Sequence, residues 1–158
     1  MNVTNVHVRE FARSRDAVWE KLRLLSTKTD PVWPHENWPR MILYPNLSQG
    51  AKGGHGPIRY TVEEILEHKE IKFRFLKPKG FDGYHLLKLE GNDEASTLIH
   101  EIRMETNFVG SVVWLVVIKH LHDALIEDAF TKLEGSLQLS QKKMEWNLWV
   151  KMLRLILK

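Results

Sequence analysis

The 158-residue sequence contains no cysteine, which excludes a disulfide scaffold, a thiol nucleophile and a cysteine-ligated zinc site. It also lacks a long apolar segment, because the longest uninterrupted run, Val112–Ile118, is far shorter than the roughly 20 residues that span a bilayer. The first residues contain no apolar stretch typical of a signal peptide, so we expect a cytoplasmic location. With 43% hydrophobic and 27% charged residues, the chain is predicted to form one globular domain rather than a disordered one.

Familiar catalytic and cofactor motifs are missing as well. The glycine-rich segment GAKGGHGP at 50–57 matches neither phosphate-binding glycine pattern, and a strand rather than a helix is predicted to follow it, so we interpret it as a hairpin bend. His120 and His122 are two apart on a predicted helix and therefore point away from each other. We expect no metal site and no cofactor, and nothing in the sequence marks a covalent nucleophile.

Positive charge is concentrated at the C-terminus. Residues 140–158 contain five basic side chains and one acidic side chain, so they carry a net charge of +4, whereas the whole chain carries +3. Residues 1–139 therefore carry a net charge of −1. A basic face with interleaved aromatic residues is the usual footprint of nucleic-acid binding, and this body gives no support for it.

Hydrophobic periodicity predicts an α+β chain. A strand at 3–13 is followed by a short helix at 15–25 that Ser14 caps, and then by a loop at 26–40 that contains three prolines and two tryptophans. Five further strands with short connections predict an antiparallel meander, and a long amphipathic helix should cover its apolar face. These strands are predicted at 41–48, 57–67, 70–77, 83–90 and 95–106, and the helix at 107–139.

This order of elements resembles the helix-grip fold of the START-domain, birch-pollen-allergen and polyketide-cyclase superfamily, often called SRPBCC. The segments that carry the resemblance are SRDAVWEKL (14–22), GGHGPIRYTVEE (53–64), FDGYH (81–85) and LHDALIEDA (121–129), and they are similar to a bacterial branch. The resemblance covers residues 3–139. It implies a curved antiparallel sheet wrapped around the long helix, with an internal cavity between them. Because the superfamily includes carriers, receptors, cyclases and aromatases, it implies a fold more than an activity.

Strand alternation and the helical arc predict which side chains face that cavity. His85, His100 and His122 fall on the apolar faces, where each is either a core histidine with one partner or a polar group that orients a ligand. Together with Asp128 they are the candidates for acid–base chemistry. Asp128 and Lys132 are expected to form a local ion pair, and Lys119, Asp123 and Glu127 a solvated face. The predicted cavity residues are Tyr60, Phe73, Phe75, His85, Leu87, His100, Ile102, Trp114, Ile118 and His122.

Three functions fit these features. The first is a binding or carrier protein for a small hydrophobic or amphipathic molecule. The second is a polyketide cyclase- or aromatase-like enzyme that uses the cavity histidines as acid–base groups. The third is a domain that acts by interaction through its C-terminal extension. Because no catalytic motif is visible, the binding protein is the leading hypothesis.

The extension at 140–158 lies beyond the helix-grip domain, which we place at 1–139. Its polar residues fall on one narrow helical arc, so we predict a basic amphipathic helix over about 141–157 with Ser140 as its cap. The arc comprises Lys143, Asn147, Lys151, Arg154 and Lys158. The remaining wide apolar surface must pack on protein or lie in a membrane interface. We expect a homodimer, with peripheral membrane contact as the alternative, and its interface to include Trp146, Trp149, Leu153 and Ile156.

Overall fold

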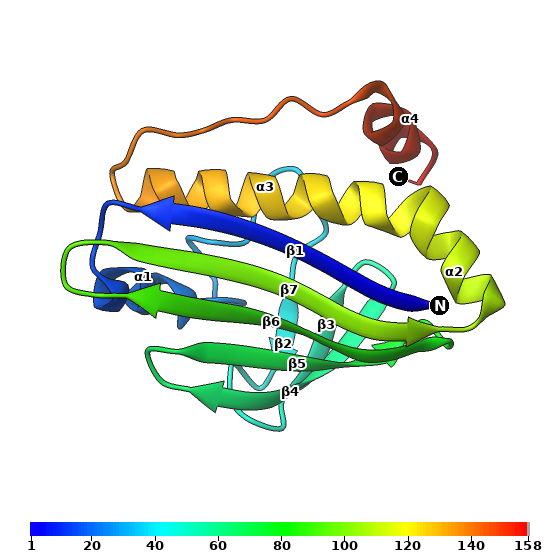
Figure 1. The fold of residues 1–158 in the computed structure, drawn as a ribbon, viewed down its shortest axis with the longest axis horizontal. Coiled ribbons are helices and arrows are strands. Elements are labelled where there is room, and N and C mark those ends of the chain that lie inside the picture. The colour runs from blue at the N-terminus through cyan, green and yellow to red at the C-terminus, as the bar shows by residue number, and fades with distance from the viewer. Residues whose placement is uncertain (158) are drawn as a thin grey trace.

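In the computed structural model, which describes residues 1–157, one seven-stranded antiparallel sheet curves beneath a long helix (Figure 1). The strand order is β1-β7-β6-β5-β4-β3-β2. The strands are β1 (Asn2–Phe11), β2 (Ile42–Tyr44), β3 (Lys52–His55), β4 (Ile58–Leu66), β5 (Glu70–Lys77), β6 (Phe81–Gly91) and β7 (Ser96–Thr106). The helices are α1 (Arg15–Leu22), α2 (Phe108–Val113), a π-helical segment (Trp114–Ile118), α3 (Lys119–Ser136) and α4 (Leu148–Ile156). The predicted α+β class and helix-grip arrangement are confirmed.

Strand β3 is the element that the sequence analysis missed. It lies in the glycine-rich segment that was interpreted as a bend, and it pairs with β2 on one side and β4 on the other. Gly54 has a φ of 155°, and a Cβ atom there would lie 1.9 Å from the carbonyl oxygen of Ile58. Glycine is therefore required for close pairing at this position, and the residue that suggested a bend instead belongs to a strand.

The proline-rich loop at 26–40 is ordered by one buried carboxylate. Asp30 is 5% exposed, and its side chain accepts hydrogen bonds from the backbone N–H groups of Ser26, Val32 and Trp33. Backbone N–H groups in a loop lack the hydrogen-bond partners that a neighbouring strand would supply. The Asp30 carboxylate accepts hydrogen bonds from them instead. The loop consequently holds Trp33 and Trp38 in fixed positions beside the sheet and α3.

The long helix forms over Phe108–Ser136, close to its predicted range. Asn107 caps its start by accepting a hydrogen bond from the N–H group of Gly110. The π-helical segment interrupts the α-helical pattern, and Figure 1 shows that α2 bends away from the axis of α3 at this place. The helix is long and apolar enough to span a membrane, although α3 lies along β1 in the structure.

Charged side chains join α3 to β1, and here the prediction of a solvated Lys119–Asp123–Glu127 face was wrong. Arg9 on β1 donates hydrogen bonds of 2.7 Å to both Glu127 and Glu134, and Glu134 is 2% exposed. His7, two residues earlier, lies 2.9 Å from Glu127 and 3.1 Å from Asp123. Helical periodicity placed Asp123 and Glu127 on a face expected to be solvated. It could not show that an edge strand with matching cations covers them.

The C-terminal extension is helical over a shorter range than predicted. Its helix, α4, begins after Asn147, whose side chain accepts a hydrogen bond from the N–H group of Val150, and Ser140 does not cap it. The preceding residues run extended along α3 (Figure 1). Of the predicted interface residues, Leu153 is buried in its own chain and Trp146 packs partly against the core, whereas Ile156 is exposed. The homodimer remains a prediction, and Lys158 of the predicted polar arc lies outside the described residues.

We predict that Arg9→Met lowers the free energy of unfolding by about 3–5 kcal/mol, because it leaves Glu134 charged and buried without its cation. The double variant Arg9→Met/Glu134→Gln should recover most of this loss, since glutamine is neutral and can still accept the hydrogen bond that Lys142 N–H donates to Glu134. Urea unfolding at pH 7 measures both. A loss below about 1 kcal/mol for Arg9→Met would contradict this account of how α3 is anchored.

Candidate functional site

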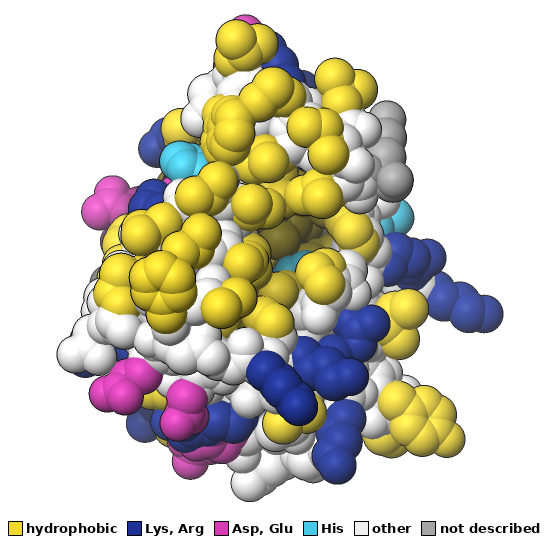
Figure 2. Space-filling view, turned by 90° about the vertical axis from the view of Figure 1, so that its right-hand side faces the viewer, with side chains coloured by type: hydrophobic (Ala, Val, Ile, Leu, Met, Phe, Trp, Pro, Cys, Tyr) yellow, Lys and Arg dark blue, Asp and Glu magenta, His cyan; other side chains and the backbone are white. Residues whose placement is uncertain are grey.

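A cavity of about 500 Å³ lies between the sheet and the long helix and opens at one end of the molecule. Figure 2 shows the opening as a hollow among apolar side chains, with a histidine visible inside it. Its walls come from the sheet, the long helix, the proline-rich loop and the C-terminal extension. The lining residues are Trp33, Trp38, Pro39, His55, Gly56, Pro57, Ile58, Phe75, Phe81, His85, His100, Ile102, Trp114, Val117, Ile118, Leu121, His122, Leu125, Ile126, Arg154 and Leu157.

Four histidines meet in this otherwise apolar space. His85 and His100 project from β6 and β7, and their ring centres lie 5.5 Å apart. His122 on α3 closes the row, with its ring 4.9 Å from that of His100. His55 contributes from β3, and its Nδ1 lies 3.2 Å from the hydroxyl oxygen of Tyr60. The rings of His85, His100 and His122 therefore form one continuous row, and the ring of Tyr60 lies between His85 and His55.

Burial keeps these imidazoles uncharged. It lowers the pKa of His55 to about 3 and lowers the pKa values of His85 and His100 well below the usual histidine range. Burial also lowers the pKa of His122, although Asp123 opposes part of that effect. At neutral pH each ring therefore has one nitrogen that donates and one that accepts a hydrogen bond. The histidines offer both kinds of group without a charge, whereas the guanidinium of Arg154, which also belongs to the lining, lies over Trp38 and Trp146.

Three of these rings have hydrogen-bonding capacity that the protein does not use. Nε2 of His85, Nδ1 of His100 and Nδ1 of His122 are buried and have no hydrogen-bond partner among residues 1–157. The nearest carboxylate to His122 Nδ1 is that of Asp123 at 3.8 Å, which is too far for a hydrogen bond. An unpartnered buried polar atom is costly, so a ligand or water in the cavity would stabilise these groups.

Seven of the ten predicted cavity residues line the cavity, namely Phe75, His85, His100, Ile102, Trp114, Ile118 and His122. Tyr60 and Phe73 are fully buried behind it, where the ring of Phe73 stacks on His85 with 4.7 Å between ring centres. Leu87 is partly buried and packs against the core without lining the cavity. Period-two alternation gives the inward face of a strand correctly. It cannot tell whether a neighbouring side chain covers an inward residue. Ligand binding by these residues remains a prediction.

The sequence analysis missed the two irregular walls. Trp33 and Trp38 come from the proline-rich loop, and Arg154 and Leu157 come from the C-terminal extension. The only available signal was the pair of tryptophans in a loop that prolines prevent from forming regular structure. The role of Arg154 was concealed because it falls on the polar arc of α4, where a solvated side chain is the usual expectation.

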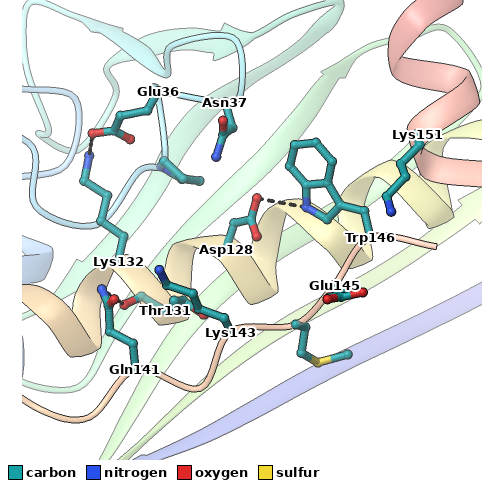
Figure 3. Close-up of a pocket in the computed structure, with 12 residues that line it drawn as sticks. Glu36, Asn37, Asp128, Thr131, Lys132, Gln141, Lys143, Glu145, Trp146 and Lys151 are labelled. Carbon is teal, nitrogen blue, oxygen red and sulfur yellow. Dashed lines mark hydrogen bonds and ion pairs between the residues drawn. The ribbon is translucent and has the colours of Figure 1, made fainter. Parts of the chain in front are cut away.

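The extension is fastened by Asp128, in a polar pocket on the outer side of α3 (Figure 3). Oδ2 of Asp128 accepts hydrogen bonds from both indoles, at 2.8 Å from Trp38 and 3.1 Å from Trp146. The guanidinium of Arg154 lies over both rings, 4.4 and 4.5 Å from their centres. The predicted Asp128–Lys132 ion pair was therefore wrong, because Lys132 instead bonds Glu36 at 2.8 Å. Asp128 positions the cavity wall and does not face the histidines.

A second cluster of ionisable groups extends from His122 in the cavity lining to the contact between β1 and α3. One potential metal-ligand atom from each of His7, His122 and Asp123 lies within 4.8 Å of the other two, a spacing that a metal ion could bridge. Burial would lower the pKa of His7, but its hydrogen bonds to Asp123 and Glu127 outweigh this effect and raise the pKa to about 9. Asp123 also accepts hydrogen bonds from Asn5 and from the ammonium group of Lys119 at 2.6 Å. The hydrogen bonds from His7, Asn5 and Lys119 satisfy the Asp123 carboxylate. Because His7 and Asn5 belong to β1, Asp123 links β1 to α3.

Several solved structures have this fold. CalU16 from Micromonospora echinospora matches with a TM-score of 0.60 and 10% identity, covering 98% of this chain and 83% of its own. A truncated norcoclaurine synthase from Thalictrum flavum matches with a TM-score of 0.66 and 11% identity, covering 89% and 96%. The same enzyme in complex with dopamine and hydroxybenzaldehyde matches with a TM-score of 0.65 and 11% identity, covering 90% of each chain.

No protein-family model and no curated protein sequence matches the chain. At the low identities of the solved structures, the likeness shows the fold alone. It confirms the helix-grip architecture that the resemblance to the SRPBCC superfamily implied.

Asp128 offers a matched pair of variants that tests how the cavity wall is held. Asp128→Leu removes the acceptor for both indoles, so we expect it to lower the free energy of unfolding by about 1–3 kcal/mol and to speed tryptic cleavage at Lys142 and Lys143. Asp128→Asn keeps a carbonyl oxygen that can accept both hydrogen bonds and should remain close to the unchanged protein. Equal cleavage rates for the two variants would contradict the role assigned to the carboxylate.

Proposed function

We propose that the protein binds a small, largely apolar molecule that carries one or more uncharged hydrogen-bonding groups. The observation that carries this proposal is the row of neutral histidines with unpartnered nitrogens inside an apolar cavity. A volume of about 500 Å³ lies within the usual range for small-molecule sites. Apolar walls would supply the affinity, and the few polar atoms would fix the orientation.

The chemistry of the walls narrows the ligand class. Aromatic side chains from the loop, the sheet and the helix contribute flat apolar surfaces, which suit an aromatic or polycyclic body. Neutral imidazoles suit hydroxyl or carbonyl groups better than a charged group. A structural neighbour with the same fold has been solved with dopamine and hydroxybenzaldehyde, both small aromatic molecules with hydroxyl groups. We extend this ligand class to the present chain.

The second candidate is an acid–base enzyme of the cyclase or aromatase type. It is favoured by the close approach of His85, His100 and His122, because adjacent neutral imidazoles can both accept and donate protons. The same residues serve either function, so the distinction depends on whether the bound molecule is changed.

Native mass spectrometry of the freshly purified protein should reveal any ligand that co-purifies, and titration with two matched probes tests recognition directly. We expect 2-naphthol to bind more tightly than naphthalene, because its hydroxyl can pair with an unpartnered imidazole nitrogen. His100→Leu or His122→Leu should reduce the preference about tenfold while leaving stability unchanged or higher, since each removes an unpaired buried polar group. His120→Leu, on the same helix but outside the cavity lining, is the control.

If His100→Leu still prefers 2-naphthol over naphthalene and its free energy of unfolding falls by about 2 kcal/mol or more, His100 is a structural core residue and not a ligand-orienting group.

Deuterium incorporation separates the carrier from the enzyme. A ligand that co-purifies is extracted and returned to the protein in D₂O. A carrier should release it with its mass and its carbon-bound hydrogens unchanged. An acid–base enzyme should introduce deuterium at carbon or convert the ligand, and His100→Leu should abolish the change. Exchange that persists in His100→Leu would remove that residue from any catalytic role.

A further inference from the structure

Large apolar side chains are exposed around the mouth of the cavity. Phe108 and Leu148, the first residues of α2 and α4, are 84% and 83% exposed. Further members are Val112 on α2, Val116 on the π-helical segment, and Leu155 and Ile156 on α4. We call these six residues the apolar rim. Figure 2 shows apolar side chains surrounding the hollow on this end of the molecule. A contiguous patch of this kind marks an interaction surface.

The long helix shows the same excess of apolar surface. Its most apolar stretch has a mean hydropathy of 1.5, yet only 22% of that stretch is buried in the structure. The buried core helix of a globular protein would hide most of such a stretch. The helix also cannot leave the sheet, because Asp123, Glu127 and Glu134 pair with β1. Part of the unburied stretch lines the cavity, and the exposed apolar side chains belong to α2 and the π-helical segment. A surface can cover these side chains while α3 stays in place, which favours contact with a surface over spanning.

Basic residues stand beside the rim. Arg59 and Lys77 face each other across β4 and β5 and are both exposed, and Lys79 follows in the adjoining turn. Arg59 directly follows Pro57 and Ile58, which line the cavity, so this cluster lies at the mouth. On α4, Lys151 adds a further exposed cation. Figure 2 shows a group of basic side chains next to the hollow.

We propose that the apolar rim docks on an anionic lipid bilayer and that the cavity exchanges its ligand with that bilayer. The apolar side chains would enter the headgroup region while the neighbouring cations contact lipid phosphates. A second copy of the chain fits less well, because a twofold interface centred on the mouth would bring each cation cluster close to its own copy. The exchange part rests on the proposed function, whereas the docking part does not.

The test is co-sedimentation with vesicles of phosphatidylcholine alone or with 30% phosphatidylglycerol. The full chain should bind the anionic vesicles at low salt and bind less as salt rises. Phe108→Asp and Leu148→Asp should each lower the partition coefficient at least tenfold. Both positions follow a helix cap, where the helix dipole favours an aspartate, so both variants should fold. Leu66→Asp, at the opposite end of the sheet and 44% exposed, is the matched control.

Three results would overturn the proposal. The full chain could stay in the supernatant with anionic vesicles. The rim variants could bind no less than Leu66→Asp does. Finally, analytical ultracentrifugation could show a dimer that Phe108→Asp dissociates, which would assign the rim to a second copy. Binding of 2-naphthol separates the two proposals. If the rim docks on the bilayer, Phe108→Asp should lose vesicle binding and still bind 2-naphthol. If the unchanged protein binds vesicles but not 2-naphthol, the proposed ligand is wrong and the docking proposal stands.

Discussion

The ion pairs between β1 and α3 decide where a cavity can exist in this molecule. Arg9 and His7 hold Glu134, Glu127 and Asp123 along one flank of the helix, so that flank closes against the edge of the sheet. Among residues 1–157, no such strand lies beside the opposite flank. It is closed instead by the proline-rich loop and the C-terminal extension, which meet at Asp128. The helix therefore spans an apolar space that is sealed along both sides and open at the end near α2 and α4.

The same arrangement separates charge from the cavity. His122 and Asp123 are neighbours in sequence, yet one ring lines the cavity and the other side chain bonds β1. His7, which has two carboxylates within hydrogen-bond distance, has its pKa raised to about 9 and is charged at neutral pH. The cavity histidines have no carboxylate at that distance among the described residues, so burial dominates and they stay neutral. Placing the acids on the flank keeps carboxylates out of the cavity lining and leaves its histidines neutral.

The sequence predicted the parts of this structure that depend on periodicity. Alternation in β6 and β7 correctly turned His85 and His100 inward, and the helical arc did the same for Trp114, Ile118 and His122. It failed where one element contacts another that is distant in sequence. The pairing of Arg9 with Glu134, the use of Asp128 by two indoles and the strand made from Gly53 and Gly54 all depend on partners that periodicity cannot identify. Helical periodicity shows that Arg154 lies on the polar face of α4. Only the packed structure shows that its guanidinium lies over the rings of Trp38 and Trp146.

The position of the apolar rim follows from the same division of the surface. Each flank of the cavity is closed by groups that satisfy one another, so apolar side chains that find no partner accumulate at the open end. Transfer of an apolar ligand from this end into water would cost roughly 25 cal/mol of free energy for each Å² of apolar ligand surface that becomes exposed. A bilayer against the rim removes most of that cost, because the ligand passes from one apolar environment to another. The neutral histidines and the apolar rim therefore have one origin: the acids of α3 pair with β1, so the cavity keeps imidazoles and apolar walls, and its open end is bordered by apolar side chains.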